Sequence, residues 1–198
     1  MSAETATREV SVTTEGIRGN LALIQDEITT TAGALEREEL AAVARLVAES
    51  RRVFVVGAGR SGLVLRMAAM RLMHLGLEVH VAGDTTTPAI GSGDLLVAAS
   101  GSGTTSGVVK AASTAAAVGA RIAVYTTDPE SPLAARADAV VVIPAARKTD
   151  HGGAVSRQYS GSLFEQVLFL ASEAVFQSLW DADGTPAEDL WLRHANLE

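Results

Sequence analysis

The chain has 198 residues, of which 47% are apolar and 20% are charged. This length suits one sizeable domain with its own core, and this composition is typical of a folded chain rather than a disordered one. The net charge of −7 argues against nucleic acid as a partner, and the absence of cysteine excludes disulfides and thiolate chemistry.

The N-terminal residues 1–5 contain no basic region followed by an apolar run, so no signal peptide is predicted. The longest apolar stretches have the length of a strand or the pattern of an amphipathic helix, and none predicts a membrane span. We therefore expect a cytoplasmic protein with no membrane contact.

Two helices are expected first, over residues 13–31 and 36–49. In the second, Leu40, Val43, Leu46 and Val47 recur at helical spacing and predict one apolar stripe. The stripe indicates that this helix packs on a core.

The middle of the chain alternates apolar runs of strand length with helical segments. Strands are expected over 53–56, 78–81, 94–99, 121–125 and 139–143, and helices over 63–75 and 104–118. Residues 128–132 predict a turn followed by at most a short helix. This alternation predicts an α/β fold, a three-layer αβα sandwich with a five-stranded parallel sheet and helices on both faces.

The last part of the chain predicts a polar loop over 144–160, a long helix over 161–180, a break at Gly184–Pro186, and a short helix over 187–195. The expected organisation is a single domain over 1–198. Its parts are N-terminal helices over 1–50, a sheet core with the ligand loops over 51–160, and C-terminal helices over 161–198.

A glycine-rich loop, Gly57–Gly62, follows the first strand and precedes a helix. It matches GxGxxG, and Asp84 lies about 20 residues further on, so a dinucleotide site is one hypothesis. A tight turn that needs glycine for backbone reasons alone is the other.

A second loop, Ser100–Thr105, follows the third strand. Hydroxyls and glycines before a helix offer several donors to one anion, and together with the first loop they predict a phosphate site. Simple capping of the helix is the alternative. The candidate phosphate-binding residues are Gly59, Ser61, Ser100, Ser102, Thr104 and Thr105.

These motifs carry a family resemblance. The segments 55–62 and 100–105 resemble a SIS (sugar isomerase) domain of flavodoxin-like type. The segment Met70–Gly76 (MRLMHLG), residues 83–90 and the tail 193–198 resemble the 6-phospho-3-hexuloisomerases within it. The loop 155–160 departs from this pattern, because Tyr159 stands where archaeal members carry a proline-containing segment. Substrate contacts of the 145–160 loop are therefore not carried over.

The resemblance implies interconversion of D-arabino-3-hexulose 6-phosphate and D-fructose 6-phosphate through a 2,3-enediolate. That reaction belongs to carbohydrate metabolism, to the ribulose monophosphate pathway and to formaldehyde assimilation. It needs a base that moves a proton between neighbouring carbons. Glu165, a carboxylate among apolar residues at the start of a predicted helix, is the candidate, with a solvated residue near the helix dipole as the alternative. The resemblance favours Glu165 as the base.

Histidine is the second expected participant. The resemblance implies a histidine supplied by an adjacent subunit, and His194, near the chain end, is the first candidate, with His74 the weaker one. His74 also suits a helix C-terminus, where a cation is favoured. The expected partners are therefore a sugar phosphate and further copies of the chain, in a homo-oligomer that we expect to be a tetramer.

No metal and no cofactor are expected, since no His or carboxylate cluster has the spacing of a metal site. Three rival hypotheses stay open: another SIS isomerase such as the arabinose 5-phosphate type, a non-catalytic sugar-phosphate sensor, and an NAD(P)-dependent oxidoreductase.

Overall fold

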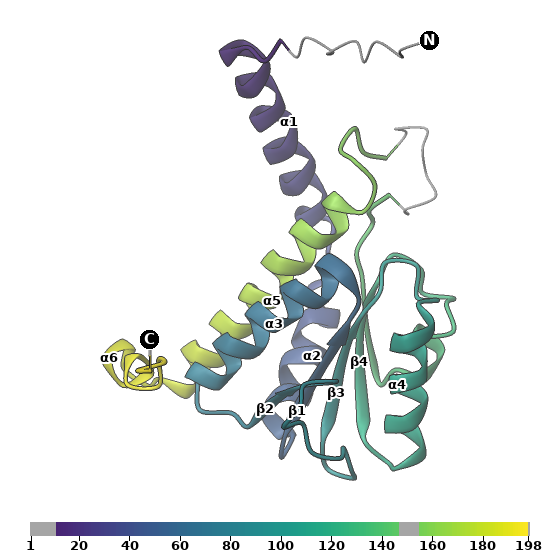
Figure 1. Ribbon diagram of the computed structural model, residues 1–198, viewed down its shortest axis with the longest axis vertical. Coiled ribbons are helices and arrows are strands. Elements are labelled where there is room, and N and C mark those ends of the chain that lie inside the picture. The colour runs from purple at the N-terminus through teal and green to yellow at the C-terminus, as the bar shows by residue number, and fades with distance from the viewer. Residues whose placement is uncertain (1–10, 147–154, 198) are drawn as a thin grey trace, which may run out of the picture.

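The computed structural model describes residues 11–146 and 155–197. Figure 1 shows their helices and strands. The helices are α1 (Thr14–Gly33), α2 (Arg37–Glu49), α3 (Gly59–His74), α4 (Ser106–Ala117), the 3₁₀ turn η1 (Ala134–Arg136), α5 (Ser162–Asp183) and α6 (Ala187–Trp191). The strands are β1 (Val53–Gly57), β2 (Val79–Val81), β3 (Leu95–Ala99), β4 (Arg121–Thr126) and β5 (Ala139–Val142).

The five strands form one parallel sheet in the order β2-β1-β3-β4-β5. The predicted α/β fold with a five-stranded parallel sheet is therefore confirmed. This order is the flavodoxin-like one, in which consecutive crossovers change direction between β1 and β3.

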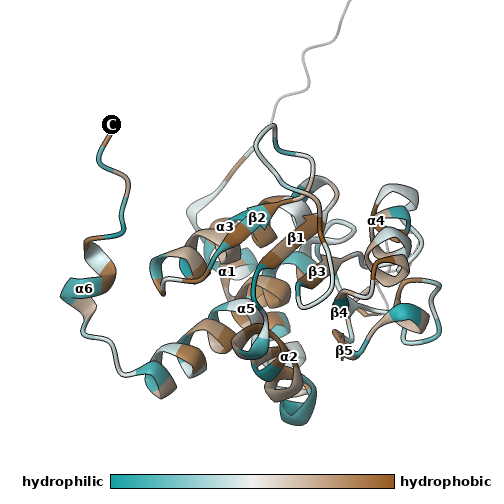
Figure 2. Cartoon of the chain, turned by 90° about the horizontal axis from the view of Figure 1, so that it is seen from below, coloured by the Kyte–Doolittle hydropathy of each residue, from teal (hydrophilic) through white to brown (hydrophobic). Residues whose placement is uncertain are grey.

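Both faces of the sheet are buried, because alternate residues of each strand point to opposite sides. Helices α2, α3 and α5 cover one face, and α4 covers the other (Figure 1). Phe54 belongs to the cluster on the α4 side, whereas its neighbours Val53 and Val55 belong to the cluster under α2, α3 and α5. The strands form an apolar layer between these helices (Figure 2).

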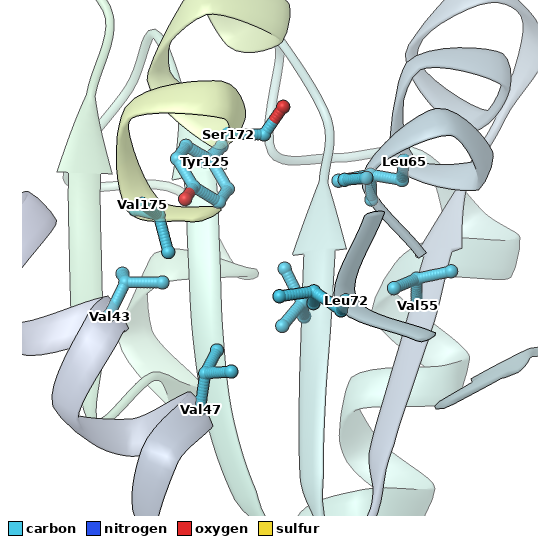
Figure 3. A pocket seen from close by; sticks show the side chains of 10 residues that line it. Val43, Val47, Val55, Leu65, Leu72, Tyr125, Ser172 and Val175 are labelled. Atoms are coloured by element: carbon cyan, nitrogen blue, oxygen red, sulfur yellow. The ribbon is translucent and has the colours of Figure 1, made fainter. Parts of the chain in front are cut away.

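The larger cluster contains a small cavity of about 20 Å³ between the sheet and α2, α3 and α5 (Figure 3). Tyr125 from β4 reaches into it, beside Val43, Leu65 and Val175. Burial raises the pKa of the Tyr125 phenol, so this side chain stays neutral at any physiological pH.

Three helices differ by three or four residues from the sequence-based expectation. Helix α5 ends at Asp183 rather than at residue 180. Helix α3 begins at Gly59 rather than at residue 63, so Arg60 and Ser61 lie in its first turn. Helix α6 ends at Trp191 rather than at residue 195. None of the helices in the described ranges combines the length and the apolar character needed to cross a bilayer.

Candidate active site at the carboxyl edge of the sheet

The loops after β1 and β3 lie next to each other, because these two strands pair directly over their whole length, from Val53–Leu95 to Gly57–Ala99. The chain leaves β1 in one direction and β3 in the other. In open α/β sheets this change of direction opens a crevice where ligands bind.

The loop after β1 places α3 against the strand without an intervening side chain. A Cβ on Gly62 would lie 2.5 Å from the carbonyl oxygen of Gly57, and one on Gly57 would lie 2.9 Å from the amide nitrogen of Gly62. Both glycines are therefore required by close backbone approach. Ser61 is buried in the first turn of α3, beside this contact.

Asp84, the acidic residue that a dinucleotide site would need, is already engaged. Its carboxylate accepts hydrogen bonds from the Arg66 guanidinium at 2.6 and 3.1 Å. The close approach of Gly57 and Gly62 accounts for the glycine motif without a dinucleotide.

In the loop after β3 the hydroxyls pair with one another. The Oγ of Ser100 lies 2.9 Å from Oγ1 of Thr105, and the Thr104 hydroxyl donates to Oγ of Ser102 at 2.9 Å. Thr105 is the N-cap residue of α4, yet its side chain makes no capping hydrogen bond. Capping therefore does not account for this hydroxyl, and the cluster lies at a helix N-terminus where an anion is favoured.

The same loop is held in place by the end of β4. The Oγ1 atoms of Thr126 and Thr127 donate to the carbonyl of Gly101 at 3.1 and 2.8 Å. Gly103 has a φ of +63°, and a Cβ there would lie 2.0 Å from the Ser131 hydroxyl. The loop conformation thus requires glycine at position 103.

Glu165 lies in the first turns of α5 and is only 4% exposed. Its carboxylate forms an ion pair with Arg60, whose side chain is 64% exposed. The preceding residue, Phe164, packs against Gly101 of the second loop, since a Cβ there would lie 3.6 Å from the Phe164 ring. The start of α5 therefore adjoins the candidate phosphate loop.

A cavity of about 350 Å³ opens beside Glu165. Its lining comprises the ion pair of Arg60 with the buried Glu165 and five exposed or half-buried residues of α3 and α5: Leu63, Val64, Met67, Gln166 and Phe169. The sequence did not single out Arg60 or Gln166. Arg60 stands inside the GxGxxG motif, which was a signal, but its pairing with a residue 105 positions away was not visible.

The two candidate histidines contact each other and do not contact Glu165. The His74 and His194 rings stack with centroids 3.9 Å apart, and the centroid of a Trp191 ring lies 4.5 Å from that of His194. Arg193 donates to the His74 carbonyl at 2.8 Å. Burial, together with His194 and Arg71 nearby, lowers the pKa of His74 and favours the neutral ring.

This histidine pair lies at the far end of α3 from the candidate phosphate and base residues. Arg60 is in the first turn and His74 is the last residue of the helix, so they are about 21 Å apart along its axis. Figure 1 shows α6 at that opposite end. One chain brings Ser61, the loop 100–105 and Glu165 to one edge, but it does not bring either histidine there.

In the described ranges no group of three or more His, Asp or Glu side chains is arranged to hold a metal ion.

The SIS domain profile matches residues 46–170 of the sequence, which include both loops and Glu165. The chain belongs to the SIS domain family. The 3-hexulose-6-phosphate isomerase of Mycobacterium gastri is 67% identical over 189 residues, which cover 96% of this chain and 95% of that protein. The 3-hexulose-6-phosphate isomerase of Bacillus subtilis is 37% identical over 179 residues, covering 90% and 97% of the two chains.

A solved structure shares the fold of this chain. A hypothetical protein of Methanococcus jannaschii, whose crystal structure was taken to infer a function as a 3-hexulose-6-phosphate isomerase, superimposes with a TM-score of 0.79. The alignment covers 91% of this chain and 99% of that one at 24% identity, a level that shows the fold alone.

Proposed function

We propose that this SIS enzyme interconverts D-arabino-3-hexulose 6-phosphate and D-fructose 6-phosphate. The observation that carries the proposal is a buried carboxylate, Glu165, next to two hydroxyl-bearing loops at the sheet edge. Relatives of 67% and 37% identity that are named 3-hexulose-6-phosphate isomerases support the choice of substrate.

The phosphate group is assigned to the two loops. Ser61 and Gly59 contribute from the start of α3, and Ser100, Ser102, Thr104 and Thr105 from the loop before α4. Hydroxyls and backbone N–H groups at helix N-termini can bind an anion even where the net charge of the protein is negative. The hydroxyl pairs now formed within the loop would exchange one partner for a phosphate oxygen.

Glu165 is assigned the role of general base. It takes the C2 proton of the 3-ketose, the C2–H electrons form the C2–C3 double bond of the enediolate, and the carbonyl π electrons move to O3. The proton is then returned to C3 as the carbonyl forms at C2, and a proton moves from O2 to O3. Arg60 must release the Glu165 carboxylate for this step, and its exposed side chain has room to turn toward the developing oxyanion.

We assign the oxygen-to-oxygen proton transfer to His194 of a neighbouring copy, with His74 stacked behind it. An exposed apolar stripe on α3, formed by Leu63, Met67, Met70 and Met73, supports a homo-oligomer. Met67 lies midway in sequence between Arg60 and His74. A second α3 that crosses antiparallel at Met67 would therefore bring its histidine pair to this chain's Glu165. A tetramer built from such dimers is the assembly we propose.

We also infer that residues 1–198 form a single SIS domain in the cytoplasm. The profile match covers 46–170, and helices on both sides of that range pack on the same core, as Val43 of α2 and Val175 of α5 show.

The test is a coupled assay that detects fructose 6-phosphate formed from the 3-hexulose phosphate. Turnover in the range of ordinary enzymes, about 1–10³ per second, is expected. A purified, folded chain that forms no fructose 6-phosphate refutes the proposal. Arabinose 5-phosphate, assayed separately for the pentulose phosphate that its isomerisation would form, is the control for substrate class.

A further inference from the structure

A chain of hydrogen bonds links α1 to the residue after Glu165. The Glu27 carboxylate of α1 accepts from the Ser156 hydroxyl at 2.7 Å, from the Arg157 backbone N–H at 2.8 Å and from Nε2 of Gln158 at 3.0 Å. Oε1 of Gln158 in turn accepts from Nε2 of Gln166 at 2.8 Å. Glu27 thereby fastens the loop that leads into α5.

The carboxylate determines which way both amides point. Glu27 is ionised and can only accept, so Gln158 must turn its NH₂ group toward it. The side-chain oxygen of Gln158 then faces Gln166, and Gln166 donates a hydrogen bond to it from its own NH₂ group. Oε1 of Gln166 is left over, and within the described residues it is a buried acceptor without a hydrogen-bond partner.

That oxygen belongs to a residue on the wall of the Glu165 cavity. A buried acceptor without a partner costs free energy unless a ligand supplies a donor. A sugar hydroxyl is such a donor, whereas a phosphate group chiefly offers acceptor oxygens.

Resting on the proposed function, we propose that Gln166 accepts a hydrogen bond from a hydroxyl of the sugar, and that Glu27 and Gln158 are positioning residues that keep its oxygen available. The hydrogen bond to Gln166 thus contributes to recognition of the carbohydrate part of the substrate and not of its phosphate.

The electrostatic state of Glu27 fits this role. Burial alone would raise the pKa of Glu27, but the hydrogen bonds from Arg157, Ser156 and Gln158 outweigh it and lower the pKa. The carboxylate therefore stays charged, and the orientation of both amides holds, down to pH values below its ordinary 4.5.

The test reverses the direction of the hydrogen bonds. In Glu27→Gln, an NH₂ group faces Gln158, both amides turn over, and Gln166 presents NH₂ instead of oxygen. The affinity of the Glu27→Gln variant for fructose 6-phosphate should fall about five- to tenfold, which corresponds to the loss of one hydrogen bond. Affinity for inorganic phosphate should stay within about twofold, and Asp26→Asn, the same charge change on the exposed neighbouring position of α1, should behave as wild type.

The double variant Glu27→Gln with Gln166→Glu decides between positioning and mere structural support. Gln166→Glu alone sets a carboxylate against the oxygen of Gln158 and should weaken fructose 6-phosphate binding. Together the two changes restore a consistent set of hydrogen bonds with an acceptor at position 166, so the loss of affinity in the double variant should be clearly smaller than the sum of the two single losses.

Additive losses in the double variant, or equal losses for fructose 6-phosphate and inorganic phosphate, overturn the inference. The readout is affinity, measured by titration calorimetry, so it is separate from turnover. A wild-type chain that binds fructose 6-phosphate without isomerising it refutes the proposed function. The inference about Gln166 is then decided by the affinities of the variants alone. A wild-type chain that binds the sugar phosphate no tighter than inorganic phosphate overturns this inference.

Discussion

Replacing Gly62 by alanine tests the closest backbone contact of the candidate site. The new Cβ would lie 2.5 Å from the carbonyl oxygen of Gly57, and real Cβ contacts essentially never fall below 3.0 Å, so α3 and β1 must separate by about 0.5 Å. Both atoms at the contact are backbone, and Gly57 is held in the sheet by its pairing with Ala99 of β3, so neither can move freely. Overpacking of this kind costs about 1–3 kcal/mol.

The assay is thermal unfolding with and without fructose 6-phosphate, at one protein concentration. For a chain of this size each kcal/mol lowers Tm by about 2–4 °C. Ser61 adjoins the contact, so the stabilisation by the sugar phosphate should also shrink. Gly107→Ala is the control, because a Cβ there meets nothing within 4 Å, and it should raise stability by up to about 1 kcal/mol. A Gly62→Ala protein that melts with the wild type would refute the close-contact argument.

Three other changes test the base, a buried ion pair and the assembly. Glu165→Gln should lower turnover by about two to four orders of magnitude with little change in phosphate affinity, measured in the coupled assay. The Asp94 carboxylate is fully buried against Arg52, and its hydrogen bonds from Arg52 lower its pKa below the ordinary 3.8 although burial opposes this. That stabilisation is complete above about pH 4 and is lost as pH falls through the lowered value, so Asp94→Asn should cost about 3–5 kcal/mol in urea unfolding at pH 7, and the cost should shrink as pH falls through that value. Mixed oligomers of Glu165→Gln and His194→Ala should recover activity if sites are shared, and verified mixed oligomers without activity would show that each site is built from one chain.

Local pattern was enough to predict the sheet and most helices. Apolar runs fixed the five strands to within two residues, and helical periodicity located α2 and α5. The start of α3 was predicted four residues late, because Gly59, Arg60 and Ser61 carry no apolar periodicity and their helical conformation depends on the contact between Gly57 and Gly62. Helix α6 is shorter than predicted, and only Leu190 of that helix is buried, so little packing supports its last turn.

The candidate site was predictable only where its residues follow one another in the chain. Both hydroxyl loops and Glu165 stand in short motifs, and the fold brings them to one edge. The pairing of Arg60 with Glu165 and the contacts of Glu27 with the loop before α5 join residues more than 100 positions apart. No periodicity or spacing marks such pairs, because tertiary packing alone decides them.

The two ends of α3 limit what one copy of the chain can do. Its first turn carries Arg60 and Ser61, and its last residue, His74, stacks on His194. The backbone positions of Arg60 and His74 lie about 21 Å apart along the helix axis, a gap that rotation of the two side chains cannot close to hydrogen-bond distance. The histidine pair and Glu165 of one copy therefore cannot act on the same substrate atoms while His194 stays docked. If His194 takes part in the reaction from this position, it does so in the site of another copy, and assembly is then a condition of catalysis rather than of stability alone.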